Sequence, residues 1–529
     1  MQIFSFPYGQ VKSLAYKDVF YQNHYHDLKE FLAFPPTIEG LHKAIPQRQN
    51  YDVDRQLLHE IWSSQYNASA TELQLFNISK ITEKTTFTVT TAHQPVIFGG
   101  PAYYFYKICS TIHLANSLNA DFPDFHFIPV FINGSEDHDV EEIKKTYVFQ
   151  NEIVWDTPQR GPVGRFSTEG LDQVFENFSH LLGHSPTANQ IITIFQESLQ
   201  GATDYNTFVF NWVNAFFGKY GLLFLNMDNA DLKRNFISIM RAEIFETPSQ
   251  ALVLETQNSL EQFGFKPQAH AREVNLFYLA HQSRDRIILE ENNSYLIGNH
   301  HYSAEQLSEM LTSHPEYFSP NVILRPLYQE FSLPNIAFIG GGGEISYWLE
   351  RKQQFEHFGV FYPVLIRRNS FLLVPKNIQK TIEKLHLELS DFLLPQHEII
   401  TKYLGLVSEH STDLTEEENS IMNAFDAVAK KAGLVDATLE PFVHGEASKL
   451  IKGFSNIKHR IIKAAKSREE TSINQIKNIH EKLFPAGGLQ ERKDNFFSFL
   501  VNQSDKDLLE EMIQMSDPMD KSFKVVLLD

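Results

Sequence analysis

The chain is poor in cysteine, in positive charge and in long apolar runs. Its single cysteine, Cys109, excludes an intrachain disulfide and any zinc cluster built from cysteines. Because 65 Asp and Glu residues outnumber 46 Lys and Arg residues, the formal net charge of -19 argues against nucleic acid or an anionic membrane as a partner. No stretch approaches the roughly 20 apolar residues of a membrane helix, and the first ten residues lack a signal-peptide pattern. We therefore expect a soluble cytoplasmic protein.

The composition favours large packed cores. The chain is 42% hydrophobic and 13% aromatic, and its 529 residues suffice for about three domains. Cys109 lies in an apolar helical pattern, so we expect it to be buried and unreactive.

One apolar run ends abruptly in ionisable residues. Phe127–Ile132 predicts a buried strand, which leads through Asn133-Gly134-Ser135 into Glu136-Asp137-His138-Asp139. Ligands of open α/β sheets bind just outside the carboxyl ends of such strands. A carboxylate beside an imidazole stabilises the imidazolium, so Asp137 and His138 are candidate acid/base groups near neutral pH. Glu136 and Asp139 are candidate binding residues.

The preceding segment predicts a strand, a glycine-containing loop and a helix. The strand is Thr86–Thr90, and its exit loop carries His93, Gln94 and Gly100. Pro101 suits the first turn of a helix over Ala102–Asn119, on which Lys107 lies. With the strand from Phe127 this forms a βαβ unit, which predicts a Rossmann-like α/β fold with a parallel sheet.

Later segments repeat this arrangement of a strand ending in polar residues, and we expect these strand ends to converge on one crevice together with His93 and a later glycine run. Gly221–Asp228 ends in a carboxylate, and Asn335–Ile339 runs into Gly340–Gly343 and Glu344. A glycine run before a helix lets backbone N–H groups converge on an anion. Val322–Pro326, with Arg325, is also predicted to be a strand, and Phe361–Ile366 is predicted to be the last strand.

Two stretches, about 150–205 and 230–320, interrupt this core and are predicted insertions. The first carries Arg165, which we expect to face the site. The second contains three short apolar segments between 276 and 297 that predict a small meander, and its helical part is expected to break near Pro248.

From residue 376 the pattern predicts long helices over Lys376–Leu389, Glu416–Ala432 and Leu439–His480. Heptad spacing in the third of these predicts a short coiled coil with an interruption, because a second set of apolar positions resumes the spacing out of phase at Ile473, Ile476, His480 and Leu483. Either an intramolecular hairpin or a dimer seam fits it. We therefore expect a Rossmann-like catalytic core over 1–375, a helical coiled-coil domain over 376–482, and a C-terminal segment over 483–529 of mixed loops and helices that packs back on the core. The heptad residues are Leu450, Phe454, Ile457, Ile461 and Ala464.

Other site types fit the same residues less well. A zinc or manganese site with His93 as a further ligand of the acidic cluster is chemically feasible, although no HExxH spacing supports it. The glycine run lacks the Lys-Ser/Thr of a Walker A loop. It also matches the dinucleotide fingerprint poorly, because Ser346 takes the place of the third glycine. A metal-dependent hydrolase and a non-catalytic coiled-coil scaffold stay open as alternatives.

The ordered set of motifs resembles the bacillithiol synthase family of cysteine ligases. The motifs are Thr91-Ala92-His93-Gln94, Gly99-Gly100-Pro101, Tyr106-Lys107, Glu136-Asp137-His138-Asp139, Arg325-Pro326 with Gln329-Glu330, Gly340–Trp348, and the tail Leu483-Phe484-Pro485 with Leu489-Gln490-Glu491-Arg492. Two positions depart from the family pattern: many relatives carry Gln where His93 stands, and Ser135 interrupts Gly-Glu-Asp-His-Asp.

The resemblance implies a ligase that joins the carboxyl group of cysteine to the amine of glucosaminyl-malate, the last step of bacillithiol synthesis. It also implies a Rossmann-like core with inserted segments and a coiled-coil domain, through which we expect a homodimer. Because a free carboxylate does not acylate an amine without activation, we expect ATP with Mg²⁺ as co-substrate, and no tightly bound cofactor or metal.

Within that reading, the candidate catalytic residues are Asp137, His138, His93 and Lys107. Asp137 and His138 would deprotonate the attacking ammonium, and Lys107 and His93 would offset developing phosphoryl charge. The candidate substrate- or nucleotide-binding residues are Gln94, Gly100, Glu136, Asp139, Arg165, Arg325, Gln329, Gly340, Gly341, Gly342, Gly343 and Glu344.

Overall fold

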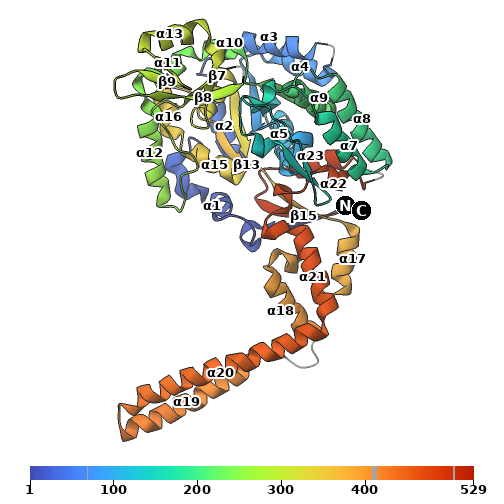
Figure 1. Ribbon diagram of the computed structural model, residues 1–529, viewed down its shortest axis with the longest axis vertical. Helices are drawn as coiled ribbons and strands as arrows, with labels where there is room; N and C mark the ends of the chain where they lie inside the picture. Colours follow the sequence, from blue (N-terminus) through green and yellow to red (C-terminus); the bar gives the residue numbers. More distant parts are fainter. Residues whose placement is uncertain (68, 281, 408–413, 504–506, 529) are drawn as a thin grey trace.

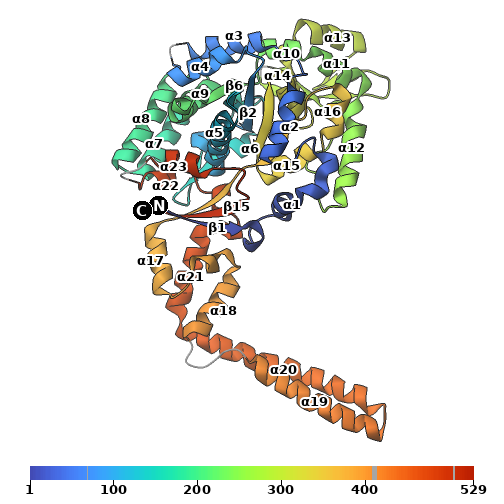
Figure 2. The same cartoon turned by 180° about the vertical axis from the view of Figure 1, so that it is seen from behind.

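The computed structural model describes residues 1–67, 69–280, 282–407, 414–503 and 507–528, and it consists of an α/β body and a helical arm (Figure 1). The arm extends away from the body, whereas both ends of the chain lie where the arm begins (Figure 2). No helix in the described ranges is long and apolar enough to cross a membrane.

A five-stranded parallel sheet forms the centre of the body, in the order β13-β12-β2-β3-β6. Its strands are β2 (Thr86–His93), β3 (His126–Asn133), β6 (Leu223–Asn226), β12 (Asn335–Gly340) and β13 (Val364–Arg367). Helix α5 (Tyr103–Asp121) connects β2 to β3. The predicted Rossmann-like parallel sheet is therefore confirmed, and the carboxyl ends of its strands lie along one edge.

Both faces of the sheet are buried, because successive side chains of each strand point to opposite sides. Phe131 and Phe224 pack into one core with α5 and the helices of the first insertion. Val130, Ile132 and Leu225 pack into a second core on the other face. Continuous apolar runs such as Phe127–Ile132 are what a strand buried on both faces requires.

Additional elements precede the sheet and form the first insertion. The elements are β1 (Gln2–Pro7), α1 (Tyr16–His24), α2 (Ile38–Arg48), α3 (Arg55–Tyr66), α4 (Glu72–Lys80), α6 (Val140–Ile143), β4 (Lys145–Val148), β5 (Asn151–Val154), α7 (Leu171–Leu182), α8 (Pro186–Gln200) and α9 (Tyr205–Phe217).

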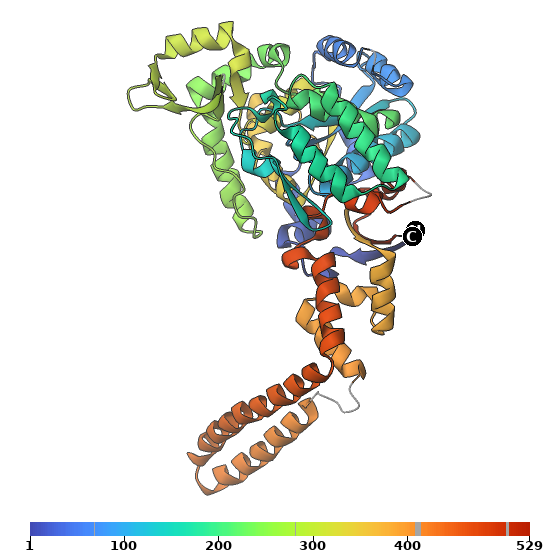
Figure 3. The ribbon, with the colours of Figure 1, turned by 45° about the vertical axis from the view of Figure 1, so that its right-hand side comes forward.

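The second insertion contains the predicted meander, which is part of a five-stranded sheet, β10-β9-β8-β7-β11. It projects from the side of the body (Figure 3), and its helices break at Pro248 as expected. Its elements are α10 (Ala230–Asn235), α11 (Ile237–Glu246), α12 (Pro248–Glu261), β7 (Leu276–Ala280), β8 (Ser283–Leu289), β9 (Tyr295–Ile297), β10 (His300–Tyr302), α13 (Ala304–Ser313) and β11 (Phe318–Pro320).

The strand predicted over Val322–Pro326 is wrong. The chain turns at Asn321, whose side chain accepts hydrogen bonds from the backbone N–H groups of Ile323 and Leu324. Helix α14 (Arg325–Ser332) then begins with Pro326 in its first turn, where a missing N–H costs nothing. The remaining helices before the arm are α15 (Gly342–Leu349) and α16 (Lys352–Phe358).

The arm also departs from the expected helix boundaries. The first helix, α17 (Lys376–Lys384), ends before Leu389. The long helix predicted over Leu439–His480 is two helices, α20 (Leu439–Arg468) and α21 (Glu470–Leu483), and the break between them lies where the heptad spacing is interrupted. Helices α18 (Gln396–Val407) and α21 pack beside the body, whereas α19 (Thr415–Val435) and α20 form the protruding hairpin (Figure 1).

The tail was expected to contain only loops and helices, and this is wrong. It contains α22 (Phe497–Leu500) and α23 (Leu508–Met515), and it ends in a strand, β15 (Ser522–Leu527). β15 lies between β1 and β14 (Ser370–Val374) in a three-stranded sheet. Both ends of the chain are thus held together beside the arm.

Two buried ion pairs attach distant segments to the end of β13. Arg367 Nε donates to Asp18 Oδ1 of α1 at 2.7 Å, and Arg368 Nη2 donates to Glu491 Oε1 at 2.7 Å. All four side chains are at most 2% exposed. A charge left unpaired in such a place is strongly unfavourable, so each arginine requires its carboxylate.

We predict that Asp18→Ala lowers the unfolding free energy by about 3–5 kcal/mol, because it leaves the Arg367 guanidinium buried without its anion. Thermal or denaturant unfolding of the full chain measures the change. Glu39→Gln is the matched control, since Glu39 forms an exposed pair with Lys43, and it should unfold like the wild type. Equal stability of Asp18→Ala and the control would contradict the prediction.

Candidate functional site

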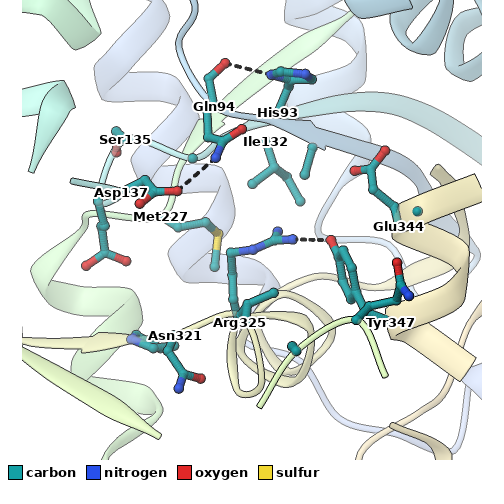
Figure 4. Close-up of a pocket in the computed structure, with 18 of the residues that line it drawn as sticks. His93, Gln94, Ile132, Ser135, Asp137, Met227, Asn321, Arg325, Glu344 and Tyr347 are labelled. Atoms are coloured by element: carbon teal, nitrogen blue, oxygen red, sulfur yellow. Dashed lines mark hydrogen bonds between the residues drawn. The ribbon is translucent and has the colours of Figure 1, made fainter. Parts of the chain in front are cut away.

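A cavity of about 610 Å³ lies at the carboxyl edge of the central sheet. Figure 4 shows its side chains converging from β2, from the end of β3, from Met227 after β6, and from α14 and α15. The meander of the second insertion closes the opposite side. This is the position at which open α/β sheets bind ligands.

The expectation that the ends of separate strands meet in one crevice is confirmed. Nine of the candidate residues line the cavity: His93, Gln94, Lys107, Glu136, Asp137, Arg325, Gly341, Gly343 and Glu344. Parallel strands bring them together although as many as 251 positions separate them in the chain.

Asp137 presents an ionised carboxylate to the cavity. Gln94 Nε2 donates to its Oδ2 at 2.9 Å, the backbone N–H of His138 donates to its Oδ1 at 2.7 Å, and an Arg284 nitrogen lies 3.6 Å away. Burial acts to raise the pKa of Asp137, but these donors and charges outweigh it and hold the pKa well below its usual range. An anion held in this way is suited to bind an ammonium group.

His93 is held as a neutral ring. Its Nδ1 lies 2.9 Å from the carbonyl oxygen of Gln94, which can only accept, so Nδ1 carries the proton. Its Nε2 then accepts from the Tyr103 hydroxyl at 3.0 Å. Burial lowers the pKa of His93 to about 3, and the nearby Lys107 ammonium acts in the same direction. With both nitrogens occupied and no charge, His93 orients neighbouring groups and has no free lone pair for a metal.

Lys107 is almost completely buried and pairs with Glu344 at 2.8 Å, while it also donates to the carbonyl oxygen of Ala92. Glu344 Oε2 in turn accepts from the backbone N–H of Gly341 at 2.9 Å. Burial acts to raise the pKa of Glu344, but Lys107 and this N–H outweigh it, and the pKa is lowered. Part of the predicted anion cradle is therefore occupied by a carboxylate of the chain itself.

Glu136 lines the cavity and belongs to a buried network of charges in its wall. Lys233 Nζ lies 2.5 Å from Glu136 Oε1 and 3.2 Å from Asp228 Oδ1. Arg165 donates twice to Asp228, at 2.7 and 2.8 Å. Burial raises the pKa of Glu136, whereas the two cations hold the pKa of Asp228 below its usual value. The expectation that Arg165 faces the site is wrong, because its guanidinium is committed to Asp228.

Two residues of the acidic cluster lie outside the cavity lining. His138 lies at the rim, half-exposed, with Nδ1 3.2 Å from Arg284 Nη1 and 3.6 Å from Asp137 Oδ1. Asp139 caps the short helix α6, since its Oδ1 accepts from the Glu141 N–H at 3.1 Å. The placement of Asp139 in the site is therefore corrected to a capping role.

Four further candidates also have structural positions. Gln329 is completely buried and donates to Glu330 and Thr90. Gly100 has φ +53°, which favours glycine, and a Cβ there would lie 2.7 Å from Val96. A Cβ on Gly340 would collide with Phe338, and one on Gly342 would lie 2.0 Å from Asp18. These glycines permit close packing and do not line the cavity.

The sequence patterns missed polar lining residues of the second insertion, of the core and of the C-terminal segment. The residues from the insertion carry no local pattern that points to a site. Arg368, by contrast, follows closely after the predicted strand Phe361–Ile366, so its place at a strand end could have identified it as a candidate. The missed polar lining residues are Tyr103, Asn133, Ser135, Gln268, His270, Arg272, Arg284, Arg286, Asn321, Tyr347, Arg368 and Arg492.

Within the described part of the chain, no three His, Cys, Asp or Glu side chains are arranged to hold a metal ion. The cavity lining instead carries more cations than carboxylates, namely Lys107, Arg272, Arg284, Arg286, Arg325, Arg368 and Arg492 against Glu136, Asp137 and Glu344. A positive cavity in an acidic protein favours anionic small molecules.

The fold and the cavity define a Rossmann-like protein with a cation-rich cavity at the strand ends and a helical arm. Comparison with protein families identifies it further: the chain belongs to the bacillithiol biosynthesis BshC family. Residues 1–369 match the N-terminal Rossmann-like domain of that family, and residues 371–528 match its C-terminal coiled-coil domain. The resemblance seen in the motifs is therefore confirmed.

Similar proteins carry the name "Putative cysteine ligase BshC". One from Flavobacterium johnsoniae is 34% identical over 94% of this chain and 95% of its own length. One from Flavobacterium psychrophilum is 35% identical over 94% of each chain. A third, from Cytophaga hutchinsonii, is 32% identical over 93% of this chain and 92% of its own.

We predict that His93→Gln makes the protein less sensitive to acid. Folded His93 takes up a proton only near pH 3, whereas in the unfolded chain it does so below about pH 6.5. The unfolded state therefore binds more protons, and stability is lost as the pH falls below about 6.5.

Between pH 7 and pH 5 this effect should lower the free energy of unfolding of the wild type by about 2 kcal/mol. The His93→Gln variant should not lose this amount. The melting temperatures of both proteins at the two pH values measure this effect. The other titrating groups contribute equally to both proteins, so their contributions cancel when the two changes are subtracted. An equal loss in both proteins would show that His93 is not buried as a neutral ring.

Proposed function

We propose that the protein is a cysteine ligase that forms an amide between the carboxyl group of L-cysteine and the amine of glucosaminyl-malate, the last step of bacillithiol biosynthesis. Membership of the family and the names of the relatives support this reaction. The observation that carries it is the pairing, in one cavity, of the ionised Asp137 with an excess of cations.

The chemistry of the substrates fits this charge pattern. Glucosaminyl-malate carries one amine and two carboxylates, and cysteine carries one of each. Asp137 offers a carboxylate to an ammonium group, while arginines such as Arg284, Arg286 and Arg325 offer guanidinium groups to carboxylates. Arg325 Nη2 donates to the Tyr347 hydroxyl at 2.6 Å, which holds its guanidinium toward the cavity (Figure 4).

Amide formation requires an activated carboxyl group. The cysteine carboxylate attacks the α-phosphorus of Mg²⁺-bound ATP, pyrophosphate leaves, and an acyl adenylate forms. The amine of glucosaminyl-malate then attacks the acyl carbon, and AMP leaves. Cations in the cavity stabilise the negative charge that develops on the phosphoryl oxygens.

The attacking amine must first lose a proton. Asp137 binds and orients the ammonium group, and His138, 3.6 Å from Asp137, takes the proton at the rim of the cavity. His93 serves this arrangement indirectly, because it holds the backbone of Gln94, whose side chain donates to Asp137.

We predict that the purified protein, given cysteine, glucosaminyl-malate and Mg²⁺-ATP, produces bacillithiol and one AMP for each product molecule. Asp137→Asn should lower kcat/KM for glucosaminyl-malate by about 10²–10⁴-fold, since it removes the anion that orients the amine. Mass spectrometry of the thiol and chromatography of the nucleotides measure both. Glu141→Gln, which changes an exposed carboxylate on the neighbouring helix, is the matched control.

Wild-type rates in Asp137→Asn and in His138→Ala would overturn these roles. A protein that makes no thiol under any of these conditions would overturn the ligase assignment. Unchanged bacillithiol in cells that lack the protein would do the same.

We also propose that the protein is a homodimer through its helical arm. The stripe predicted from heptad spacing is not covered by α19, because Leu450, Ile457 and Ile461 on α20 are 47%, 53% and 38% exposed. Val428 and Phe442 nearby are exposed as well. An apolar stripe of this length along a two-helix hairpin is suited to pack against the same stripe of a second copy.

We predict a sedimentation mass of two chains at micromolar concentration, and of one chain for the double variant Leu450→Glu, Ile457→Glu. The two glutamates of this variant would be buried without partners in the dimer interface, which makes the dimer unfavourable. Lys452→Glu, on an exposed position of the same helix, should stay dimeric. A one-chain mass for the wild type would reject the proposal.

A further inference from the structure

Positive charge collects at one end of the cavity, around the N-terminus of α15. The first backbone N–H groups of a helix have no partner within the helix and carry a partial positive charge. In α15, Glu344 occupies the N–H of Gly341. Those of Gly342 and Gly343 follow in the same turn, and Gly341 and Gly343 both line the cavity.

A buried guanidinium nitrogen without a partner points at the same place. Arg368 is 2% exposed and lines the cavity, and two of its nitrogens donate to the carbonyl oxygen of Asn369 and to Glu491. Its Nε has no hydrogen-bond partner among the described residues. That nitrogen lies 3.7 Å from where a Cβ of Gly341 would be. A buried donor left unpaired is costly, so an acceptor is missing here.

Two further cations reach this end from distant parts of the chain. Lys17 of α1 places Nζ 3.7 Å from where a Cβ of Gly343 would be, and it donates to Gln268 at 2.6 Å. Arg492, which follows the buried Glu491, is an exposed side chain on the cavity wall. Its charge also affects Lys17: burial lowers the pKa of Lys17, and Arg492 lowers it further.

The charges at this end do not balance. Asp18 is paired with Arg367, Glu491 with Arg368, and Glu344 with Lys107. Lys17 and Arg492 have no such carboxylate within ion-pair distance among the described residues. An excess of about two positive charges therefore surrounds the helix N-terminus and the unpartnered Arg368 Nε.

We propose that this end of the cavity is a binding subsite for an oxyanion of about two negative charges, completed by Lys17, Arg368 and Arg492. Its ligand is a phosphate group of the nucleotide or the dicarboxylate of the malyl group, which share this chemistry. The subsite rests on the proposed function for the identity of its ligand. Its existence is tested without catalysis.

The test is isothermal titration of the full-length protein with sodium pyrophosphate and, separately, with L-malate at low salt. Arg492→Gln and Gly343→Ala should each weaken binding at least tenfold, the first by removing a charge and the second by placing a methyl group beside Lys17. Gly343 has no positive φ and room for a Cβ, so this variant should fold. Lys493→Gln removes a charge one position away, at a residue that packs on Tyr147, and it should bind like the wild type.

If pyrophosphate binds more tightly than L-malate and both variants weaken that binding, the subsite is assigned to the nucleotide. If L-malate binds more tightly than pyrophosphate and both variants weaken that binding, the subsite is assigned to the malyl group. Failure of the wild type to bind either anion at millimolar concentration overturns the proposal. So does equal weakening by Arg492→Gln and Lys493→Gln, which would show only a general effect of charge. If binding is weakened as expected but no bacillithiol forms in the ligase assay, the subsite stands and the proposed function falls.

Discussion

The rest of the structure depends on two consecutive arginines at the carboxyl end of β13. Arg367 and Arg368 are buried, and a buried guanidinium is tolerated only beside a carboxylate. The chain supplies those carboxylates from its two extremes, Asp18 and Glu491. The same requirement that keeps the arginines paired therefore draws α1 and the C-terminal segment against the edge of the sheet where the cavity lies.

This pairing determines which other side chains reach the cavity. Lys17 precedes Asp18 in the chain, and Arg492 follows Glu491, so fixing the two carboxylates also fixes the two cations beside them. Gly342 permits the approach, because any Cβ there would occupy the position of Asp18. The C-terminal segment that carries Arg492 begins where α21 ends, which connects the cavity to the arm through one short stretch of chain.

The sequence predicts well those helices, strands and site residues that neighbours along the chain determine. It predicts poorly those that contacts between distant segments determine. Period-two and apolar patterns identified β2, β3 and β12, and parallel pairing then implied that His93, Asp137 and Gly341 meet. The strand predicted from the apolar run Val322–Leu324 is wrong because the run leads directly into a helix, α14, with Pro326 in its first turn. Arg284 and Arg492 were missed because their positions follow from insertion packing and from a buried ion pair, neither of which leaves a local pattern. The predictions that Gln329 and Arg165 belong to the site are not supported, because the polar groups of these two residues bond to other side chains away from the cavity.

The position of Glu344 explains how the cavity tolerates its own charge without a ligand. Lys107 is buried, and an unpaired ammonium group there would be unfavourable. Glu344 neutralises it and also accepts a hydrogen bond from the backbone N–H of Gly341, the residue before α15. Lys107 is consequently not a free cation in this state, in contrast to the role expected from its motif. An arriving oxyanion meets Glu344 beside the same helix end, so it must bind next to this carboxylate or replace it at Gly341. Replacement would leave Lys107 to pair with the incoming anion, and only then would Lys107 act directly on substrate charge.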